Sequence, residues 1–171
     1  MACEAINFVL KRVLKEERPA RMQNKGYGMP SSHAQFVSFF SITLALFLVF
    51  RHTPKPRTEE HTPLSMGSRL GLSGLVMGGA GVVAWSRVYL GYHTPKQVWV
   101  GCLAGAVCAV GWFAFTAVVR HYGFMSWVLE LPVVRMFRMR DLVVNEDLVQ
   151  AGWETWEEQR KRRDGGSKKE R

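Results

Sequence analysis

The chain has 171 residues, of which 47% are hydrophobic and 12% aromatic, and its 23 Lys and Arg against 14 Asp and Glu give a net charge of +9. This length is typical of one domain, and the apolar content excludes a largely disordered polar chain. The positive charge suits nucleic acid, anionic lipid or a phosphorylated small molecule, but no zinc-finger, homeodomain or RNA-binding signature accompanies it. We therefore expect no nucleic-acid partner. Three cysteines, an odd number, predict no disulfide framework.

Residues 1–17 show the helical spacing of apolar side chains, with cations between them. Their basic residues follow the apolar stretch instead of preceding it, which excludes a signal peptide. Pro19 disfavours α geometry at the residue before it, so we expect this helix to stop at Arg18. Lys11 and Arg18 are about two turns apart and would share one helix face.

Residues 30–33 read Pro-Ser-Ser-His and stand before an abruptly apolar run. Ser31 or Ser32 can cap the following helix, and Gln35 can complete a capping box from Ser32. The free backbone N–H groups at such a helix start attract phosphate. The stretch that begins at Lys11 and ends here therefore predicts an anion site.

Three uncharged apolar runs cover residues 34–50, 70–85 and 97–119, and the last has 23 residues. That length is enough to cross a bilayer, and the first run is long enough once it is extended back by one residue. Residues 51–65 hold three prolines and mixed charge, which predicts an exposed loop. A soluble all-α bundle is the alternative, but the run at 97–119 argues against it. We expect an all-α, integral-membrane helical bundle with about three full transmembrane helices and a partial first one.

Two Gly-x-x-x-Gly pairs lie in these runs, Gly74 with Gly78 and Gly101 with Gly105. Glycine destabilises a helix in water, but in a membrane such pairs let a neighbouring backbone approach closely. We therefore expect both pairs to lie at helix contacts.

The C-terminal part changes in character. Residues 122–134 are apolar but short, which predicts an interfacial or packed helix, and the charged segment beyond holds Trp153 and Trp156, which suit a surface-lying piece. We expect a membrane core over residues 1–138 and a charged cytosolic tail over residues 139–171.

A second polar segment, residues 86–97, separates two of the apolar runs. Thr94 is a good N-cap, Pro95 suits the first helical position, and Gln97 can close a capping box. His93 therefore stands at a helix start, as His33 does.

If each apolar run crosses once, both histidines lie on the same membrane face. A single histidine at a helix cap is usually structural, but two on one face beside Lys11, Arg18 and Arg87 favour chemistry. No cluster of carboxylates stands near them to hold Mg²⁺, so the pattern indicates phosphoryl transfer without a metal or cofactor. The cations would neutralise the phosphoryl oxygens, one histidine would attack, and the other would protonate the leaving oxygen.

Three motifs, Lys11-x6-Arg18-Pro, Pro30-Ser-Ser-His33 and Ser86-Arg87-x5-His93, resemble the signature of the type-2 phosphatidic acid phosphatase superfamily, written KxxxxxxRP, PSGH and SRxxxxxHxxxD. The segments KGYGMPSSHAQ and SRVYLGYHTPKQV are most similar to its dolichyl-diphosphatase branch. The resemblance covers about residues 5–120. Members generally have six transmembrane helices, so we expect this chain to begin inside the third.

The resemblance implies His93 as the nucleophile, which forms a phosphohistidine, and His33 as the general acid. It also implies that the phosphoryl group is bound by Lys11, Arg18, Ser31, Ser32 and Arg87. Ser32 replaces a glycine of the pattern, and Gln97 replaces the aspartate that orients the nucleophile. The Gln97 oxygen can still accept the Nδ1–H of His93; the alternative is that Gln97 is only a capping-box residue.

By the same resemblance the function is hydrolysis of dolichyl diphosphate to dolichyl phosphate and phosphate, which supports recycling of the lipid carrier of N-glycosylation. The enzyme would be a multi-pass protein of the endoplasmic reticulum membrane with its site on the lumenal face. Its partners would be the polyprenyl diphosphate and membrane lipids. A phosphatase of another lipid phosphate and a catalytically silent membrane scaffold are the alternatives.

Overall fold

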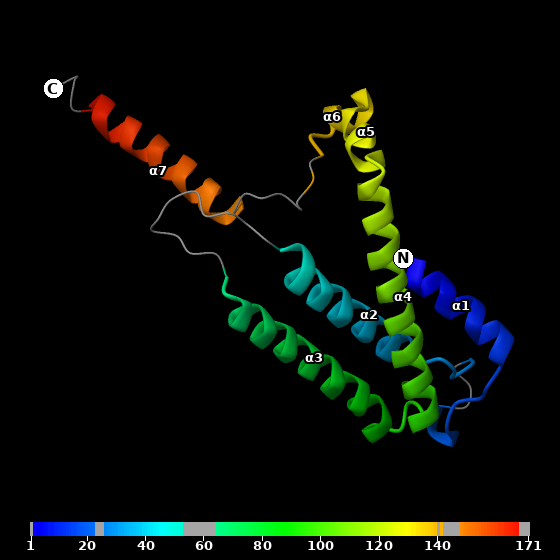
Figure 1. Cartoon of the computed structure of the whole chain (residues 1–171). Coiled ribbons are helices and arrows are strands. Elements are labelled where there is room, and N and C mark those ends of the chain that lie inside the picture. The colour runs from blue at the N-terminus through cyan, green and yellow to red at the C-terminus, as the bar shows by residue number, and fades with distance from the viewer. Residues whose placement is uncertain (1, 23–25, 53–63, 140, 142–147, 168–171) are drawn as a thin grey trace.

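The computed structural model describes residues 2–22, 26–52, 64–139, 141 and 148–167, and these residues form helices and no strands (Figure 1). The expected all-α class is therefore confirmed. The helical segments are α1 (Ala2–Leu14), η1 (Ala20–Met22), α2 (Ser32–Leu46), the π-helical turn η2 (Phe47–Arg51), α3 (Met66–Tyr89), α4 (Pro95–His121), α5 (Phe124–Glu130), α6 (Pro132–Met136) and α7 (Leu148–Ser167).

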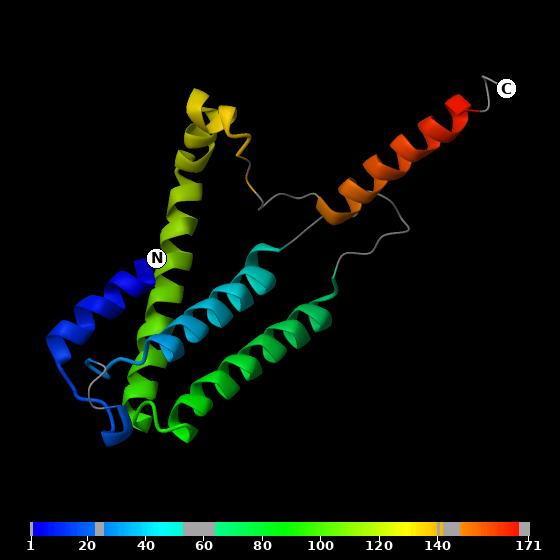
Figure 2. The same cartoon turned by 180° about the vertical axis from the view of Figure 1, so that it is seen from behind.

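Helix α2 lies at the centre of the bundle. It packs against α4 and α3, and α1 contacts it from another side (Figures 1 and 2). The end of α3, the start of α4 and the segment that joins α1 to α2 meet at one end of the molecule. That end holds both sequence motifs that contain a histidine. Helix α7 lies apart from α1–α4 in both views.

The close contact of α2 with α4 depends on two glycines of α4. A Cβ on Gly101 would lie 2.7 Å from the backbone oxygen of Ser31, and a Cβ on Gly105 would collide with the backbone oxygen of Gln35. Only glycine allows this approach, so the expectation for this pair is confirmed. The expectation for Gly74 and Gly78 was wrong for the part of the chain that the structure describes, where no atom lies within 4 Å of either Cβ position.

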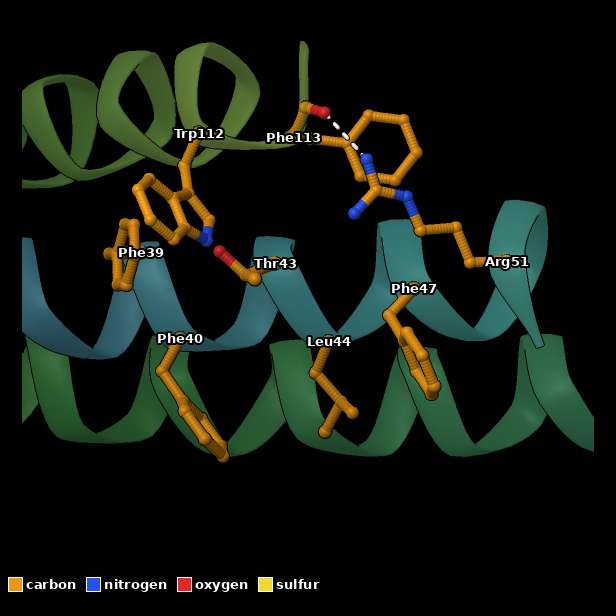
Figure 3. Close-up of a pocket in the computed structure, with 8 residues that line it drawn as sticks. All are labelled: Phe39, Phe40, Thr43, Leu44, Phe47, Arg51, Trp112 and Phe113. Carbon is orange, nitrogen blue, oxygen red and sulfur yellow. Dashed lines mark hydrogen bonds between the residues drawn. The ribbon is translucent and has the colours of Figure 1, made fainter. Parts of the chain in front are cut away.

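The opposite end of the α2–α4 contact is held by Arg51 (Figure 3). Its Nη2 donates a hydrogen bond of 2.7 Å to the backbone oxygen of Phe113, and its guanidinium lies 4.1 Å from the centre of the Phe113 ring. The Phe113 carbonyl on α4 thereby gains a charged donor, and the cation gains an aromatic face. Helices α2 and α4 are thus fixed at both ends.

Among the described residues, two helical segments are long and apolar enough to cross a membrane, Ser32–Arg51 and α4. Only 22% and 11% of their most apolar windows are buried, whereas the core helix of a soluble protein would be mostly covered. Trp99, Leu103 and Val107 of α4 are all well exposed. These surfaces suit lipid, so the chain is a membrane-associated helical protein. The expected run at 70–85 lies within α3 but does not reach the same hydropathy, because its glycines and serine contribute little.

Helix α1 ends earlier than expected, at Leu14 and not at Arg18. Lys15 adopts a left-handed conformation with φ of 46°, so Lys11 and Arg18 do not share a helix face. The carbonyls of Glu16 and Glu17, which would lack a partner at the end of a helix that stopped at Arg18, accept hydrogen bonds from Gly28 N at 2.7 Å and from the Gln97 side chain at 2.7 Å. These tertiary contacts replace the last helical turn.

The remaining expectations for the fold concern the loop and the C-terminal part. Of the expected loop over residues 51–65, residues 53–63 lie outside the described residues, and Ser65 caps α3 by accepting from Ser68 N at 3.1 Å. The segment 122–134 forms two short helices, α5 and α6, after a left-handed Gly123 with φ of 70°. Neither is long enough to cross a bilayer.

Candidate active site

Helix α4 begins with the N-terminal box that its sequence predicts. Thr94 Oγ1 accepts from Gln97 N at 3.3 Å, Gln97 Oε1 accepts from Thr94 N at 3.3 Å, and Pro95 occupies the first turn. This reciprocal capping fixes the path of the chain into α4. It also sets His93, the residue before the cap, at a defined place against the helix start.

Gln97 lies directly against His93. Its Oε1 is 3.1 Å from His93 Nδ1, and its side chain is completely buried. The same oxygen serves the helix cap and the histidine, so the two roles considered for Gln97 are not alternatives. If the Nδ1–H donates to this oxygen, the lone pair lies on the other ring nitrogen, Nε2.

Arg18 and Ser31 bring polar atoms to the same region. Gly28 lies against both Arg18 and Gln97, since a Cβ at Gly28 would be 2.9 Å from Arg18 Cγ and 2.8 Å from the Gln97 amide atoms. Ser31 N donates to Gln97 O at 3.1 Å. Arg18 Nε and Ser31 Oγ are buried without a hydrogen-bond partner in the described part of the chain. Leaving such atoms unpaired is costly, and an anion bound here would satisfy both of them.

Lys11 and Ser32 lie side by side where α1 meets α2. Lys11 Nζ donates to Ser32 Oγ at 3.4 Å. Ser31, not Ser32, is the N-cap of α2, and its side chain makes no capping bond. The expected capping box with Gln35 was therefore wrong. Gln35 instead accepts from Asn7 Nδ2 at 2.5 Å and donates to the Cys3 backbone oxygen at 2.9 Å, because burial against α1 offers it these partners.

The surroundings of His93 favour the neutral ring. Burial lowers the pKa of His93 below its ordinary value of 6.5, and the nearby charges of Arg18 and Lys11 lower it further, against the opposing hydrogen bonds to Gln97 and the Gly28 backbone. Burial is the largest of these causes. A neutral imidazole has the free lone pair that attack on phosphorus needs.

The side chains of Arg87 and His33 are less closely tied to the His93 ring than those of Gln97 and Arg18. Arg87 stands in the last turn of α3, where its carbonyl accepts from His93 N at 3.2 Å and its guanidinium lies 5.4 Å from the centre of the Tyr92 ring. It therefore holds the turn that carries His93. His33 lies exposed in the first turn of α2, and within the described residues no hydrogen bond or ion pair joins it to His93.

Two residues of this site were missed by the sequence reasoning. Glu16 Oε1 accepts from Gln97 Nε2 at 3.2 Å, and Gly28 covers the Gln97 amide. Both lie between the motif residues that we used, Glu16 two positions before Arg18 and Gly28 two positions before Pro30. Their position inside the motif spacing was the one signal that could have drawn attention to them.

Comparison with known proteins is consistent with this geometry. A human protein named dolichyldiphosphatase 1 is 39% identical over 81% of this chain, and the yeast (Saccharomyces cerevisiae) dolichyldiphosphatase is 34% identical over 81%. A third relative, from Neurospora crassa, is 49% identical over 94% of the chain, and its name describes it provisionally as a dolichyldiphosphatase. The chain spans 74% of the Neurospora crassa relative, 58% of the human one and 57% of the yeast one.

No solved structure matches the chain. The family model described as "PAP2 superfamily" matches residues 1–120, the part that contains every candidate site residue. The chain, with the three motifs and the buried histidine site that they form, therefore belongs to the PAP2 superfamily.

Proposed function

We propose that this chain is a dolichyl-diphosphatase, which hydrolyses the phosphoric anhydride of dolichyl diphosphate to dolichyl phosphate and inorganic phosphate. The observation that carries the proposal is His93, buried beside Arg18 and Lys11 at one end of the bundle with its Nδ1 held 3.1 Å from Gln97 Oε1. The names of the relatives from human, yeast and Neurospora crassa supply the substrate.

In the proposed first step, Nε2 of His93 attacks the terminal phosphorus. The bond from this phosphorus to the bridging oxygen breaks, and the bridging oxygen leaves with dolichyl phosphate and takes a proton from His33. In the second step, water attacks the phosphohistidine, gives its proton to His33, and releases inorganic phosphate. His93 and His33 thus return to their starting states.

The transferring phosphoryl group would be held by cations and by hydrogen-bond donors. Arg18 Nε and Ser31 Oγ are the buried atoms that still lack a partner among the described residues. Lys11 and Ser32 already lie together at 3.4 Å, and Arg87 completes the set from the end of α3. Three positive side chains would stabilise the charge on the equatorial oxygens of the transition state.

The proposed setting is the endoplasmic reticulum membrane, with the chain crossing more than once. The substrate is a membrane lipid, and the exposed apolar faces of α2 and α4 suit a bilayer. The His93 end would face the lumen, and the residues 51–65 at the opposite end of α2 would face the cytosol. The product, dolichyl phosphate, would then return to the lipid-carrier cycle of N-glycosylation.

The experiment is an assay of the purified full chain in lipid nanodiscs, with phosphate release measured from dolichyl diphosphate, phosphatidate and a sphingoid phosphate. Excess chelator should leave activity unchanged, and His93→Ala protein from the same preparation is the control. We expect release from dolichyl diphosphate above the other two lipids. Preference for phosphatidate or the sphingoid phosphate would favour the other lipid phosphatase reading, and no release from any substrate would favour the scaffold reading.

A further inference from the structure

The Gln97 side chain lies between His93 and a carboxylate from another part of the chain. On one side its Oε1 is 3.1 Å from His93 Nδ1. On the other side its Nε2 donates to Glu16 Oε1 at 3.2 Å and to the Glu17 backbone oxygen at 2.7 Å. Glu16 follows α1, while His93 and Gln97 belong to the start of α4, so the fold brings these groups together across about 80 residues.

The hydrogen-bond partners fix which way the Gln97 amide points. Its oxygen faces the Thr94 backbone N–H, which can only donate, at 3.3 Å. Its nitrogen faces a carboxylate and a carbonyl, which can only accept. A flipped amide would set donor against donor and acceptor against acceptor. The orientation seen in the structure is therefore the one that satisfies all of these groups.

This orientation decides the tautomer of His93. A carbonyl-type oxygen at Nδ1 requires the proton on Nδ1 and leaves the lone pair on Nε2. With the amide flipped, an N–H would donate to Nδ1 and the proton would move to Nε2, which could then no longer attack. The partners of the Gln97 nitrogen thus act on the reactivity of the histidine.

From this arrangement, and resting on the proposed function, we infer that Glu16 is a positioning residue of the hydrolase. It holds the Gln97 amide in the orientation that keeps Nε2 of His93 free, and its carboxylate supplies the negative charge that a neutral glutamine lacks. The chain of contacts runs from His93 through Gln97 to Glu16.

Glu16 is itself well held for this role. Its Oε2 pairs with Lys96 Nζ at 2.8 Å, and its backbone oxygen accepts from Gly28 N at 2.7 Å. The hydrogen bond from Lys96 lowers the pKa of Glu16, with a further contribution from Gln97, so the carboxylate is charged near neutral pH. Gly28 and the surrounding chain exclude solvent from the Gln97 amide, so its orientation depends on the protein groups around it.

The test compares three variants in the nanodisc assay. Glu16→Ala removes one of the two acceptors of Gln97 Nε2. Glu16→Gln keeps an acceptor of similar shape but removes the charge. Glu4→Ala is the matched control, because Glu4 is an exposed carboxylate on α1 that makes no contact with Gln97 in the described part of the chain.

We expect Glu16→Ala to lower kcat by about 10- to 100-fold with little change in KM, the size expected of a hydrogen bond to a charged group. Glu16→Gln should fall between Glu16→Ala and wild type, and Glu4→Ala should match wild type. Loss of the Glu16 carboxylate removes stabilisation of the protonated His93 ring and so lowers the pKa of His93. The acidic limb of kcat against pH should therefore move to lower pH in both Glu16 variants. A purely structural defect would not move this limb.

A second measurement does not depend on the substrate. In protein labelled with ¹⁵N-histidine, the side-chain shifts of His93 should show the proton on Nδ1 in wild type and a mixture of tautomers in Glu16→Ala. Equal kcat, an unmoved pH limb and an unchanged tautomer in the Glu16 variants would overturn the inference. If wild type does not hydrolyse dolichyl diphosphate, the proposed function fails, while the tautomer measurement still decides the role of Glu16.

Discussion

Gly101 of α4 lies against Ser31, the residue that caps α2, so closely that a Cβ on Gly101 would stand 2.7 Å from the Ser31 backbone oxygen and 3.3 Å from its nitrogen. The same Ser31 nitrogen donates to the Gln97 backbone oxygen at 3.1 Å. The contact of two apolar helices therefore sets the position of Ser31 relative to the residue that holds His93.

Gly101→Ala should consequently reduce both stability and turnover. The added methyl group meets backbone, which cannot rotate away, and overpacking of this kind costs about 1–3 kcal/mol. Gly111→Ala is the control on the same helix, since its Cβ would meet no described atom within 4 Å. We expect a lower Tm in nanodiscs and slower phosphate release for Gly101→Ala alone; wild-type values would mean that α2 and α4 can separate without cost.

Arg18→Lys should strongly impair activity although the charge is retained. The buried Arg18 Nε has no hydrogen-bond partner among the residues that the structure describes, and a lysine offers a point charge without the planar fork that matches phosphoryl oxygens. Arg12→Lys is the matched control, because Arg12 stacks over Phe8 at 4.2 Å on the exposed side of α1. The measurement is kcat/KM, with a loss of about 10-fold or more expected for the loss of one charged hydrogen bond. Equal rates for the two variants would assign Arg18 to the membrane surface instead of the substrate.

The sequence predicted those features that depend on neighbours along the chain. Thr94, Pro95 and Gln97 follow a local capping rule, and the structure contains the complete box. The long uncharged runs predicted the centres of α2 and α4. An apolar helix in lipid can be recognised from its own sequence, without knowledge of its tertiary contacts. Gly101 and Gly105 were likewise recognised from their spacing on one helix.

What the sequence could not show depends on partners far along the chain. Helix α1 stops at Leu14, and beyond it Gly28 and Gln97 donate hydrogen bonds to the carbonyl oxygens of Glu16 and Glu17. Gln35 fits a capping box in the sequence, but in the structure it forms hydrogen bonds with Asn7 and Cys3 of α1. For Glu16 the one local signal is its position between Lys11 and Arg18, since its contact with Gln97 forms only when the fold brings α4 beside it.

The pH dependence should reflect the environment of His93. Burial, Arg18 and Lys11 all favour the neutral ring, so the acidic limb of kcat/KM should lie below pH 6.5, the ordinary value for histidine. Lys11→Met removes one cation and should raise the pKa of His93, which moves the limb to higher pH. Substrate ionisation is common to both proteins and cancels in the comparison. If the acidic limb of Lys11→Met moves to lower pH or stays in place, the charge of Lys11 does not lower the pKa of His93.

The membrane orientation can be checked by glycosylation. With the His93 end of the bundle in the lumen, an acceptor site inserted directly after His52 should remain unglycosylated in microsomes, because His52 follows the end of η2 that lies away from His93. An acceptor site inserted directly after Gly26, close to the Gly28 that lies against Gln97, is the matched control and should be glycosylated. The reverse pattern would invert the proposed topology.

The last prediction separates the two histidines by chemistry. His93→Ala should abolish turnover of every substrate, because no other ring is buried with its Nδ1 against Gln97 among the described residues. His33→Ala should be slow with dolichyl diphosphate but retain activity toward an activated aryl phosphate, whose leaving oxygen needs no proton. His52→Ala, at the far end of α2, is the control and should match wild type with both substrates. Rapid quenching should trap acid-labile phosphate on wild type and on His33→Ala treated with the aryl phosphate. The same label on protein that lacks His93 would assign the attack to another residue.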